Sequence, residues 1–393
     1  MTTIDRRPPA RPKLPILTSL RFFAAAEVLI YHFGRMTDVD VVAYYFGDSL
    51  NRFPGSIVQI ATSAGHEAVT FFFVLSGFIL TYVYLGSTES EGFAAHPRDF
   101  WWSRFARLAP SFYLGLLLAA PFLLYSIFVV HSAAPSTLFP AVILTPIFLQ
   151  SWFPSAVYVW NFPAWSLSVE FFFYALFPPL ASAAVLLTRR QLLWLAIAFV
   201  IVLAPVRSAL LAMYATAPEP LPTFAIYFPL FSLPQFVLGI ALARLFLYGP
   251  TLSPRTYRMI CLLGLAGVVV AFGWHADLPS ALAWLRPETG TAGLLFGVII
   301  FGAAGLSHAS PSNSGLLASR TMVFLGDASY SMYILHIPIS LWWKSISTKV
   351  LGLAPSPLMN FLAMFLLVIV IASLNQAYLE PPLRRWLLRR RMA

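Results

Sequence analysis

Two ionisable residues on the first apolar stretch have the types and spacing that chemistry on an anionic substrate needs. Arg21 and His32 lie eleven residues apart in PILTSLRFFAAAEVLIYHFGR. In a helix, eleven residues bring the two side chains to within about 20° of one direction, roughly 16 Å apart along the axis. A guanidinium binds phosphate oxygens, and an imidazole exchanges protons near neutral pH. The same spacing also fits a simpler interpretation, in which Arg21 extends to lipid headgroups and His32 bonds a neighbouring helix.

Two more arginines begin a later apolar stretch, FWWSRFARLAP. Arg104 and Arg107 are three residues apart, so in a helix both side chains lie on one face. Together with Arg21 they would form a cationic cluster that binds phosphate oxygens in pairs. Arginine at the end of a membrane span also anchors that end on the cytoplasmic side, and the pattern alone fits this second interpretation as well.

One carboxylate, Glu170, lies among aromatic residues in WSLSVEFFFYALFP. A buried carboxylate is costly unless it is paired or hydrogen-bonded. Glu170 is a candidate for orienting a histidine or for accepting a hydrogen bond from an acceptor hydroxyl, and it also fits a structural partner for a buried donor. Glu27 is a second acid in an apolar stretch, but it points about 120° away from the Arg21 and His32 face. We therefore leave Glu27 outside the site.

A third set of polar residues lies in FLGDASYSMYILHIPI, near the end of the chain. Helical spacing places Tyr330 and Tyr333 on one face, and likewise Tyr333 and His336. His336 is a candidate catalytic partner of His32 and Glu170, because the topology given below puts all three in the outer half of a membrane bundle. Each residue alone also fits a hydrogen bond between helices.

Smaller polar and aromatic side chains complete the candidate site. The possible acceptor or supporting contacts are Ser76, Trp165, Ser329, Tyr330 and Tyr333. Ser76 is followed by Gly77, which suits close approach of two helices. The one cysteine, Cys261, excludes an internal disulfide and argues against thiolate metal sites. We find no metal ligand set and expect no permanently bound cofactor.

The elements that must position these residues are membrane-spanning helices. Hydrophobic residues make up 59% of the chain and charged residues 10%, with a mean hydropathy of +0.78. Soluble proteins carry about 25% charged residues, so lipid must cover much of this surface. The net charge of +10 would suggest nucleic acid as a partner of a soluble protein. Here the basic residues lie at the ends and in short loops, as cytoplasmic anchors do, so we expect no nucleic-acid partner.

We predict an all-α polytopic bundle of about ten spans with both termini in the cytoplasm. The predicted spans are 14–34, 66–86, 105–130, 164–187, 191–213, 224–247, 257–273, 289–307, 321–343 and 356–379. The arginine-rich connections between spans all lie on the cytoplasmic side only if the apolar stretch 138–153 does not cross the membrane. We therefore predict that region 138–163 is re-entrant or interfacial. Residues 1–13 form a disordered basic tail, residues 14–379 a single membrane domain, and residues 380–393 a second basic tail.

Taken in order, these segments resemble the acyltransferase-3 family of bacterial membrane O-acyltransferases. The matching segments are Arg21 and His32 with ten residues between them, FFFVLSGFIL, RFAR, WSLSVEFFFYALFP, LGDASYSMYILH and YLEPPLRRWL. Each is weak alone, but the ordered set over nearly the whole chain is specific. The resemblance implies ten spans, essential roles for Arg21 and His32, and donor binding by Arg104 and Arg107. Glu27 departs from the pattern, which usually has an apolar residue there.

The resemblance implies transfer of an acyl group from cytoplasmic acyl-CoA to a hydroxyl of a cell-surface or exported glycan. The co-substrate is expected to be acetyl-CoA, the acceptor a glycan or lipid-linked sugar, and the location the bacterial inner membrane, with lipids around the bundle. In this hypothesis the arginines bind the CoA phosphates and His32 is the general base, supported by Glu170 or His336. Transient acylation of His32 is a second route.

Other functions remain open at this point. The acceptor could be a small-molecule natural product instead of a glycan. The protein could also be a transporter or flippase of a lipid-linked sugar, although we find none of the matching, interrupted halves typical of such proteins. An unrelated class of membrane-bound O-acyltransferase is a further alternative, against which the pairing of Arg21 with His32 argues.

Overall fold

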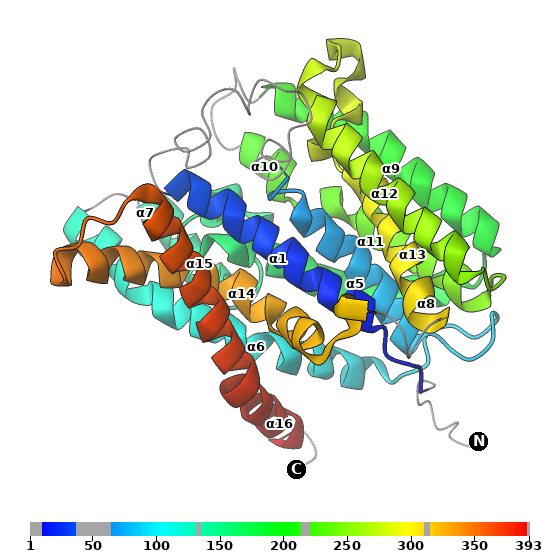
Figure 1. Cartoon of the computed structure of the whole chain (residues 1–393), viewed down its shortest axis with the longest axis horizontal. Coiled ribbons are helices and arrows are strands. Elements are labelled where there is room, and N and C mark those ends of the chain that lie inside the picture. Colours follow the sequence, from blue (N-terminus) through cyan, green and yellow to red (C-terminus); the bar gives the residue numbers. More distant parts are fainter. Residues whose placement is uncertain (1–9, 37–63, 131–134, 214–220, 310–314, 391–393) are drawn as a thin grey trace.

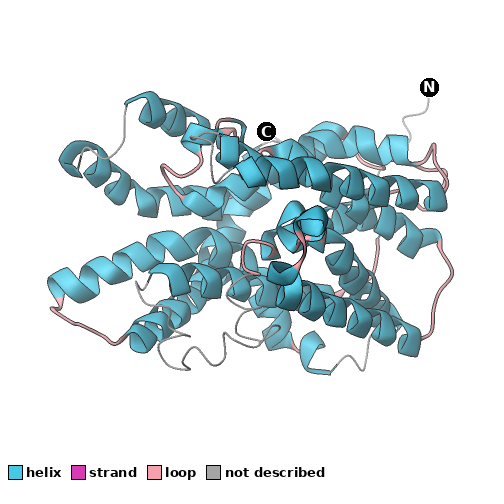
Figure 2. Ribbon diagram, turned by 90° about the horizontal axis from the view of Figure 1, so that it is seen from above, coloured by secondary structure: helices cyan, strands magenta, loops and turns pink. Residues whose placement is uncertain are grey.

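The computed structural model describes residues 10–36, 64–130, 135–213, 221–309 and 315–390. The backbone in these ranges is helical and contains no strand (Figure 2). This confirms the predicted all-α class.

Each of the ten predicted spans corresponds to one long helix of the described chain (Figure 1). These helices are α1 (Pro15–Met36), α5 (Ala68–Tyr84), α6 (Pro97–Tyr125), α8 (Trp165–Ala184), α9 (Arg189–Ala212), α11 (Pro229–Tyr248), α12 (Pro254–Trp274), α13 (Ala292–Ala309), α14 (Arg320–Ser345) and α15 (Pro357–Leu374). The shorter helices are α7 (Pro135–Leu144), α10 (Leu221–Tyr227) and α16 (Glu380–Arg390).

Eight helical segments of the described chain are long and apolar enough to cross a membrane. The two predicted spans outside this set are α5, which has 17 residues, and α14, which has 26 residues but carries several polar side chains. α14 packs against α1, α6 and α15 and buries Ser329, Ser331, His336 and Ser340, so protein rather than lipid surrounds these polar side chains. A span in the middle of a bundle can therefore be polar, because lipid does not contact it.

Helices with different exposure form the inside and outside of the bundle. α11 and α13 are largely covered by other helices, whereas α9, α12 and α15 leave most of their residues uncovered. α1 crosses the middle of the view in Figure 1 and packs against α5, α13 and α14. The described part of the chain begins and ends on the lower side of that view.

The region predicted to be re-entrant has irregular backbone and holds no long helix. After α7 it contains three short 3-10 turns, and Phe148 adopts a positive φ of 61°. Side chains satisfy its backbone: Gln150 donates to the carbonyl of Ala164 at 2.6 Å, and Ser168 to that of Phe148 at 2.7 Å. Irregular backbone at membrane depth needs such internal partners. The described helix in this region, α7, is too short to cross a membrane. That residues 138–153 do not cross stays a prediction.

Both predicted tails contain ordered structure where they are described. Arg11 lies in the segment predicted to be disordered, yet its guanidinium donates to the carbonyls of Tyr82, Leu85 and Gly86 at the end of α5. These carbonyls lack helical partners, which explains the contact. The second tail forms α16, where Trp102 of α6 donates to the carbonyl of Leu387 at 3.1 Å.

Two glycines let α5 and α11 pack closely. A Cβ at Gly77 would lie 2.1 Å from the carbonyl oxygen of Phe236, and one at Gly239 the same distance from that of Val74. Both obstacles are backbone atoms, which cannot rotate away. The prediction that Gly77 serves helix packing is confirmed, and this contact fixes the position of Ser76 beside it.

Gly77→Ala should destabilise the protein, because the new methyl group forces α5 and α11 apart. We expect a loss of about 1–3 kcal/mol, measured as a lower thermal unfolding temperature in detergent. Gly267→Ala is the control, since its Cβ would first meet the mobile end of the Leu295 side chain. Equal unfolding temperatures for the two variants would contradict the packing argument.

Candidate active site

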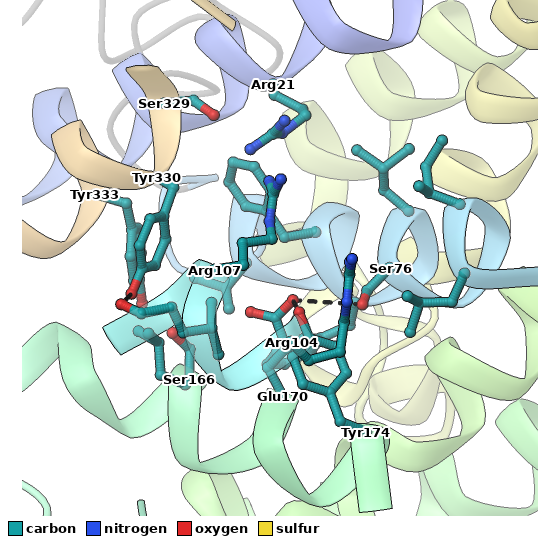
Figure 3. A pocket seen from close by; sticks show the side chains of 18 of the residues that line it. Arg21, Ser76, Arg104, Arg107, Ser166, Glu170, Tyr174, Ser329, Tyr330 and Tyr333 are labelled. Carbon is teal, nitrogen blue, oxygen red and sulfur yellow. Dashed lines mark hydrogen bonds between the residues drawn. The ribbon is translucent and has the colours of Figure 1, made fainter. Parts of the chain in front are cut away.

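Five helices enclose a cavity of about 210 Å³ (Figure 3). α1, α5, α6, α8 and α14 each contribute to its wall. Its polar lining includes Arg21, Ser76, Arg104, Arg107, Ser166, Glu170, Tyr174, Ser329, Tyr330 and Tyr333. The remaining lining is mainly apolar, from α5 above all.

The three arginines of the cavity have few partners within the protein. Arg104 donates to the hydroxyl of Tyr84 at 3.2 Å and lies over its ring, while the Nε atom of Arg104 is buried without a partner. None of the hydrogen bonds and ion pairs found among the described residues involves Arg21 or Arg107. Figure 3 shows these two side chains extending towards each other from α1 and α6. Guanidinium groups held this way are suited to bind an anion between them.

Glu170 is the carboxylate of the cavity, and its hydrogen bonds go to neutral neighbours. Its Oε1 accepts from the hydroxyl of Tyr174 at 2.5 Å and from that of Ser76 at 3.4 Å (Figure 3). With three arginines and one glutamate lining it, the cavity carries a formal charge of +3 − 1 = +2. Such a cavity is electrostatically suited to a ligand with at least two negative charges.

The α14 wall presents two tyrosine rings and one serine. The hydroxyl of Tyr330 donates to the carbonyl of Leu108 at 2.7 Å, and that of Tyr333 to the carbonyl of Pro163 at 3.1 Å. Ser329 Oγ is buried and has no hydrogen-bond partner within the described ranges. α14 can approach α1 because a Cβ at Gly326 would overlap the backbone of Thr18. This close contact brings Ser329 opposite Arg21.

His32 and His336 form a pair next to the cavity. His336 Nε2 lies 3.1 Å from His32 Nδ1, and His336 is fully buried. His32 Nδ1 also lies 3.0 Å from the carbonyl of Val28, and His336 Nδ1 lies 2.5 Å from that of Tyr333. A carbonyl only accepts, so both Nδ1 atoms carry the proton in the neutral pair.

This tautomer has a chemical consequence for His32. His336 Nε2 is then an acceptor that faces the Nδ1–H of His32. The Nε2 atom of His32 is left unprotonated, and no hydrogen bond among the described residues uses it. His32 is only partly buried, so this nitrogen is available as a base.

The structure brings together most, but not all, of the residues predicted from the sequence. Arg21, Arg104, Arg107, Ser76, Glu170, Ser329, Tyr330 and Tyr333 line one cavity. His32, His336 and Trp165 are not part of that lining. The histidine pair lies in the next layer outward, because His336 follows Tyr333 by one helical turn and their rings are 6.0 Å apart.

Two expectations therefore need correction. Arg21 lines this cavity and His32 does not, although the two residues share one face of α1. Glu170 does not orient His32 either, because its hydrogen bonds go to Tyr174 and Ser76. The contact to His32 comes from His336 instead. Glu27 is not part of the cavity lining, in agreement with its predicted direction.

Comparison with known proteins decides the family. A family model described as an acyltransferase domain, of the acyltransferase-3 type, matches residues 15–374. The chain belongs to the acyltransferase-3 family. It is a multi-pass membrane O-acyltransferase, as the order of its sequence segments indicated.

Two relatives show how far the similarity extends. The chain is 29% identical to acyltransferase MdmB of Streptomyces mycarofaciens, over 98% of this chain and 95% of that protein. It is 26% identical to peptidoglycan O-acetyltransferase OatA of Listeria monocytogenes, over 82% of this chain and 51% of that protein. The match to the second relative thus covers about half of its length. No solved structure matches this acyltransferase.

Sequence analysis missed several residues of this acyltransferase-3 site. Tyr174 lies four residues after Glu170, so helical spacing could have identified it. Tyr84 ends α5, far from Arg104 in the sequence, and no local pattern connects them. Arg384 of α16 interacts electrostatically with Arg104 and Arg107, and its Nε atom is buried without a partner. It had been assigned to a basic tail and is a fourth cation near the cavity.

Glu170→Gln should destabilise the acyltransferase by roughly 1–3 kcal/mol, because it removes the carboxylate from a cavity lined by three arginines and weakens the bond from Tyr174. Added sulfate should raise the thermal unfolding temperature of this variant more than that of the wild type, since the anion replaces the lost charge. Glu91→Gln is the control, as Glu91 is exposed and accepts from the backbone N–H of Ser87. An identical sulfate effect on all three proteins would contradict the charge count.

Proposed function

We propose that this acyltransferase moves an acyl group, acetyl above all, from cytoplasmic acyl-CoA to a hydroxyl of a cell-surface or exported glycan. The proposed location is the bacterial cytoplasmic membrane. The observation that carries the proposal is a cavity with a charge of +2 lying one layer below a histidine whose Nε2 forms no hydrogen bond with the described residues. An anionic donor bound at Arg21 and the proton acceptor His32 would thus lie one after the other along α1.

The donor is assigned by charge. Coenzyme A carries a diphosphate and a 3′-phosphate, and guanidinium groups bind phosphate oxygens in pairs. Arg21, Arg104 and Arg107 supply three such groups with few competing partners. The long uncharged arm of the donor would then extend past the apolar α5 wall towards His32, about 16 Å from Arg21 along the helix.

The chemistry follows from the tautomer of His32. Its Nε2 takes the proton of the acceptor hydroxyl as the hydroxyl oxygen attacks the thioester carbonyl. The carbon–sulfur bond breaks, and the CoA thiolate leaves with the proton returned by His32. His336 holds the ring orientation through Nδ1 of His32. The same Nε2 is also placed to carry the acyl group transiently, which gives the second route.

The acceptor class rests on the relatives. One is named as a peptidoglycan O-acetyltransferase, which supports a glycan acceptor. The other, named only as an acyltransferase, aligns almost end to end. Because that name gives no acceptor, a small molecule with a free hydroxyl remains the second candidate acceptor.

His32→Ala should abolish acyl transfer while leaving the bundle intact. The assay uses purified protein in liposomes with acetyl-CoA and an acceptor, and measures the CoA thiol released. Elution as a single species in size-exclusion chromatography controls for folding. Undiminished release by the variant would refute the role of His32. Acceptor transport without any CoA release would instead indicate a transporter.

Arg107→Gln should raise the KM for acetyl-CoA by about 10–100-fold, because a charge-assisted bond to phosphate contributes roughly 1.5–3 kcal/mol. The acceptor KM should not change. Arg98→Gln is a matched control, since Arg98 is exposed on the same helix and does not line the cavity. Equal effects of the two substitutions would mean that the cavity arginine has no special role in donor binding.

A further inference from the structure

A second polar cluster lies at the outer end of the bundle, apart from the donor cavity. We name His66, Glu67, Thr70, Arg207 and Gln235 the outer cluster. Glu67, Arg207 and Gln235 are at least nine-tenths buried. Glu67 accepts from Nδ1 of His66 at 3.0 Å and from the hydroxyl of Thr70 at 3.1 Å. A Cβ at Gly290 would lie within 4 Å of both Gln235 and Arg207, which shows that these two side chains are neighbours.

Three polar atoms of this cluster are buried and have no hydrogen-bond partner among the residues that the structure describes. They are Nε2 of His66, Nε of Arg207 and Oε1 of Gln235. Buried polar atoms are nearly always hydrogen-bonded, so three such atoms in one cluster mark a place for a polar ligand. Nδ1 of His66 donates to Glu67, so its Nε2 is a lone pair. The cluster therefore offers two acceptors and one donor.

Aromatic rings connect the outer cluster with the proposed base. The ring of His66 stacks on Trp165 at 6.0 Å, and Tyr227 packs against both rings. Phe162 contacts Tyr227 at 5.9 Å and His32 at 5.7 Å. The outer cluster and His32 thus lie at two ends of one continuous aromatic group, on the outer side of the donor cavity.

The charge of the outer cluster differs from that of the donor cavity. Arg207 and Glu67 cancel, and Glu288 also interacts electrostatically with Arg207 from outside the cluster. The outer cluster therefore has no net positive charge, whereas the cavity carries +2. A neutral ligand with several hydroxyl groups fits this combination, because each hydroxyl both donates and accepts. A sugar ring also has apolar faces that pack on aromatic side chains. A phosphate would have no reason to bind here more tightly than in the donor cavity.

We propose that the outer cluster is the acceptor subsite of this enzyme and binds a pyranose ring. His66, oriented by Glu67, accepts a hydrogen bond from one sugar hydroxyl, while the aromatic group holds the ring so that another hydroxyl reaches Nε2 of His32. The inference rests on the proposed function and names where its acceptor binds. His66 is thus a specificity-determining residue, and Glu67 and Thr70 position it.

The test measures acetyl transfer by the full chain in liposomes. The probes are methyl N-acetyl-β-D-glucosaminide, methyl α-L-rhamnoside, the monodeoxy analogues of both, and cyclohexanol as an acceptor with one hydroxyl. His66→Gln should raise the KM of a glycoside about 10-fold or more, and leave the KM of acetyl-CoA and the kcat within about twofold. His275→Gln is the matched control, because His275 lies after α12 and bonds Phe272.

A deoxy analogue identifies the hydroxyl that His66 binds. With the wild type, the KM of one deoxy analogue should exceed that of the parent glycoside by the same factor by which His66→Gln raises the KM of the parent glycoside. With the His66→Gln variant, that analogue should have the same KM as the parent glycoside, because the hydrogen bond from the sugar hydroxyl to His66 is already absent. Gln235→Met is a second variant, for use if His66→Gln folds poorly. It removes an acceptor atom without changing His66 or Glu67, and it should also raise the KM of the glycoside.

The subsite would be overturned if both variants left the glycoside KM unchanged. It would also be overturned if they raised the KM of cyclohexanol as much as that of the glycoside. Transfer by the wild type to cyclohexanol but to no glycoside would overturn the carbohydrate assignment. No CoA release with any acceptor would refute the proposed function itself, which separates the two failures.

Discussion

The cost of placing guanidinium groups inside hydrocarbon determines how this bundle is arranged. Arg21, Arg104 and Arg107 lie on helices that would otherwise be stable in lipid, and a charge facing lipid is strongly unfavourable. The helices that carry these charges must therefore turn them inward, towards Glu170 and towards each other. α9, α12 and α15 have no such residues in this cavity and form much of the outside. The charges thus specify which faces are buried, while apolar area supplies most of the stability.

α1 connects two polar compartments of different charge. Its inner half carries Arg21 into the cationic cavity, and its outer half carries His32 to His336 and the aromatic group. Three helical turns separate the two residues, which matches the distance between an anionic group and a reacting group on a long cofactor. In the proposed function, α1 would therefore set the spacing between donor binding and chemistry without help from a loop.

Sequence patterns predicted the helices well because each depends on local composition. Even α14 was predicted, although its polar residues exclude it from a simple apolarity criterion. Spacing of three and four residues also found the arginines of α6 and the tyrosines of α14. What it could not find were partners far apart in the chain. His66 and Glu67 follow a long connection and look like an exposed loop end, and only the folded chain shows Arg207 and Gln235 beside them.

A second buried carboxylate explains how the cavity keeps its arginines free for a ligand. Glu380, at the start of α16, accepts from Ser111 at 3.1 Å and Ser331 at 3.3 Å, and Asn375 donates to both serines. Glu380 attracts Arg21 and Arg107 electrostatically but bonds neither of them. A carboxylate held behind the wall offsets part of the repulsion between the guanidinium groups without occupying the positions that phosphate oxygens would take. The polar network that packs the C-terminal helix against α6 and α14 is therefore part of the electrostatics of the site.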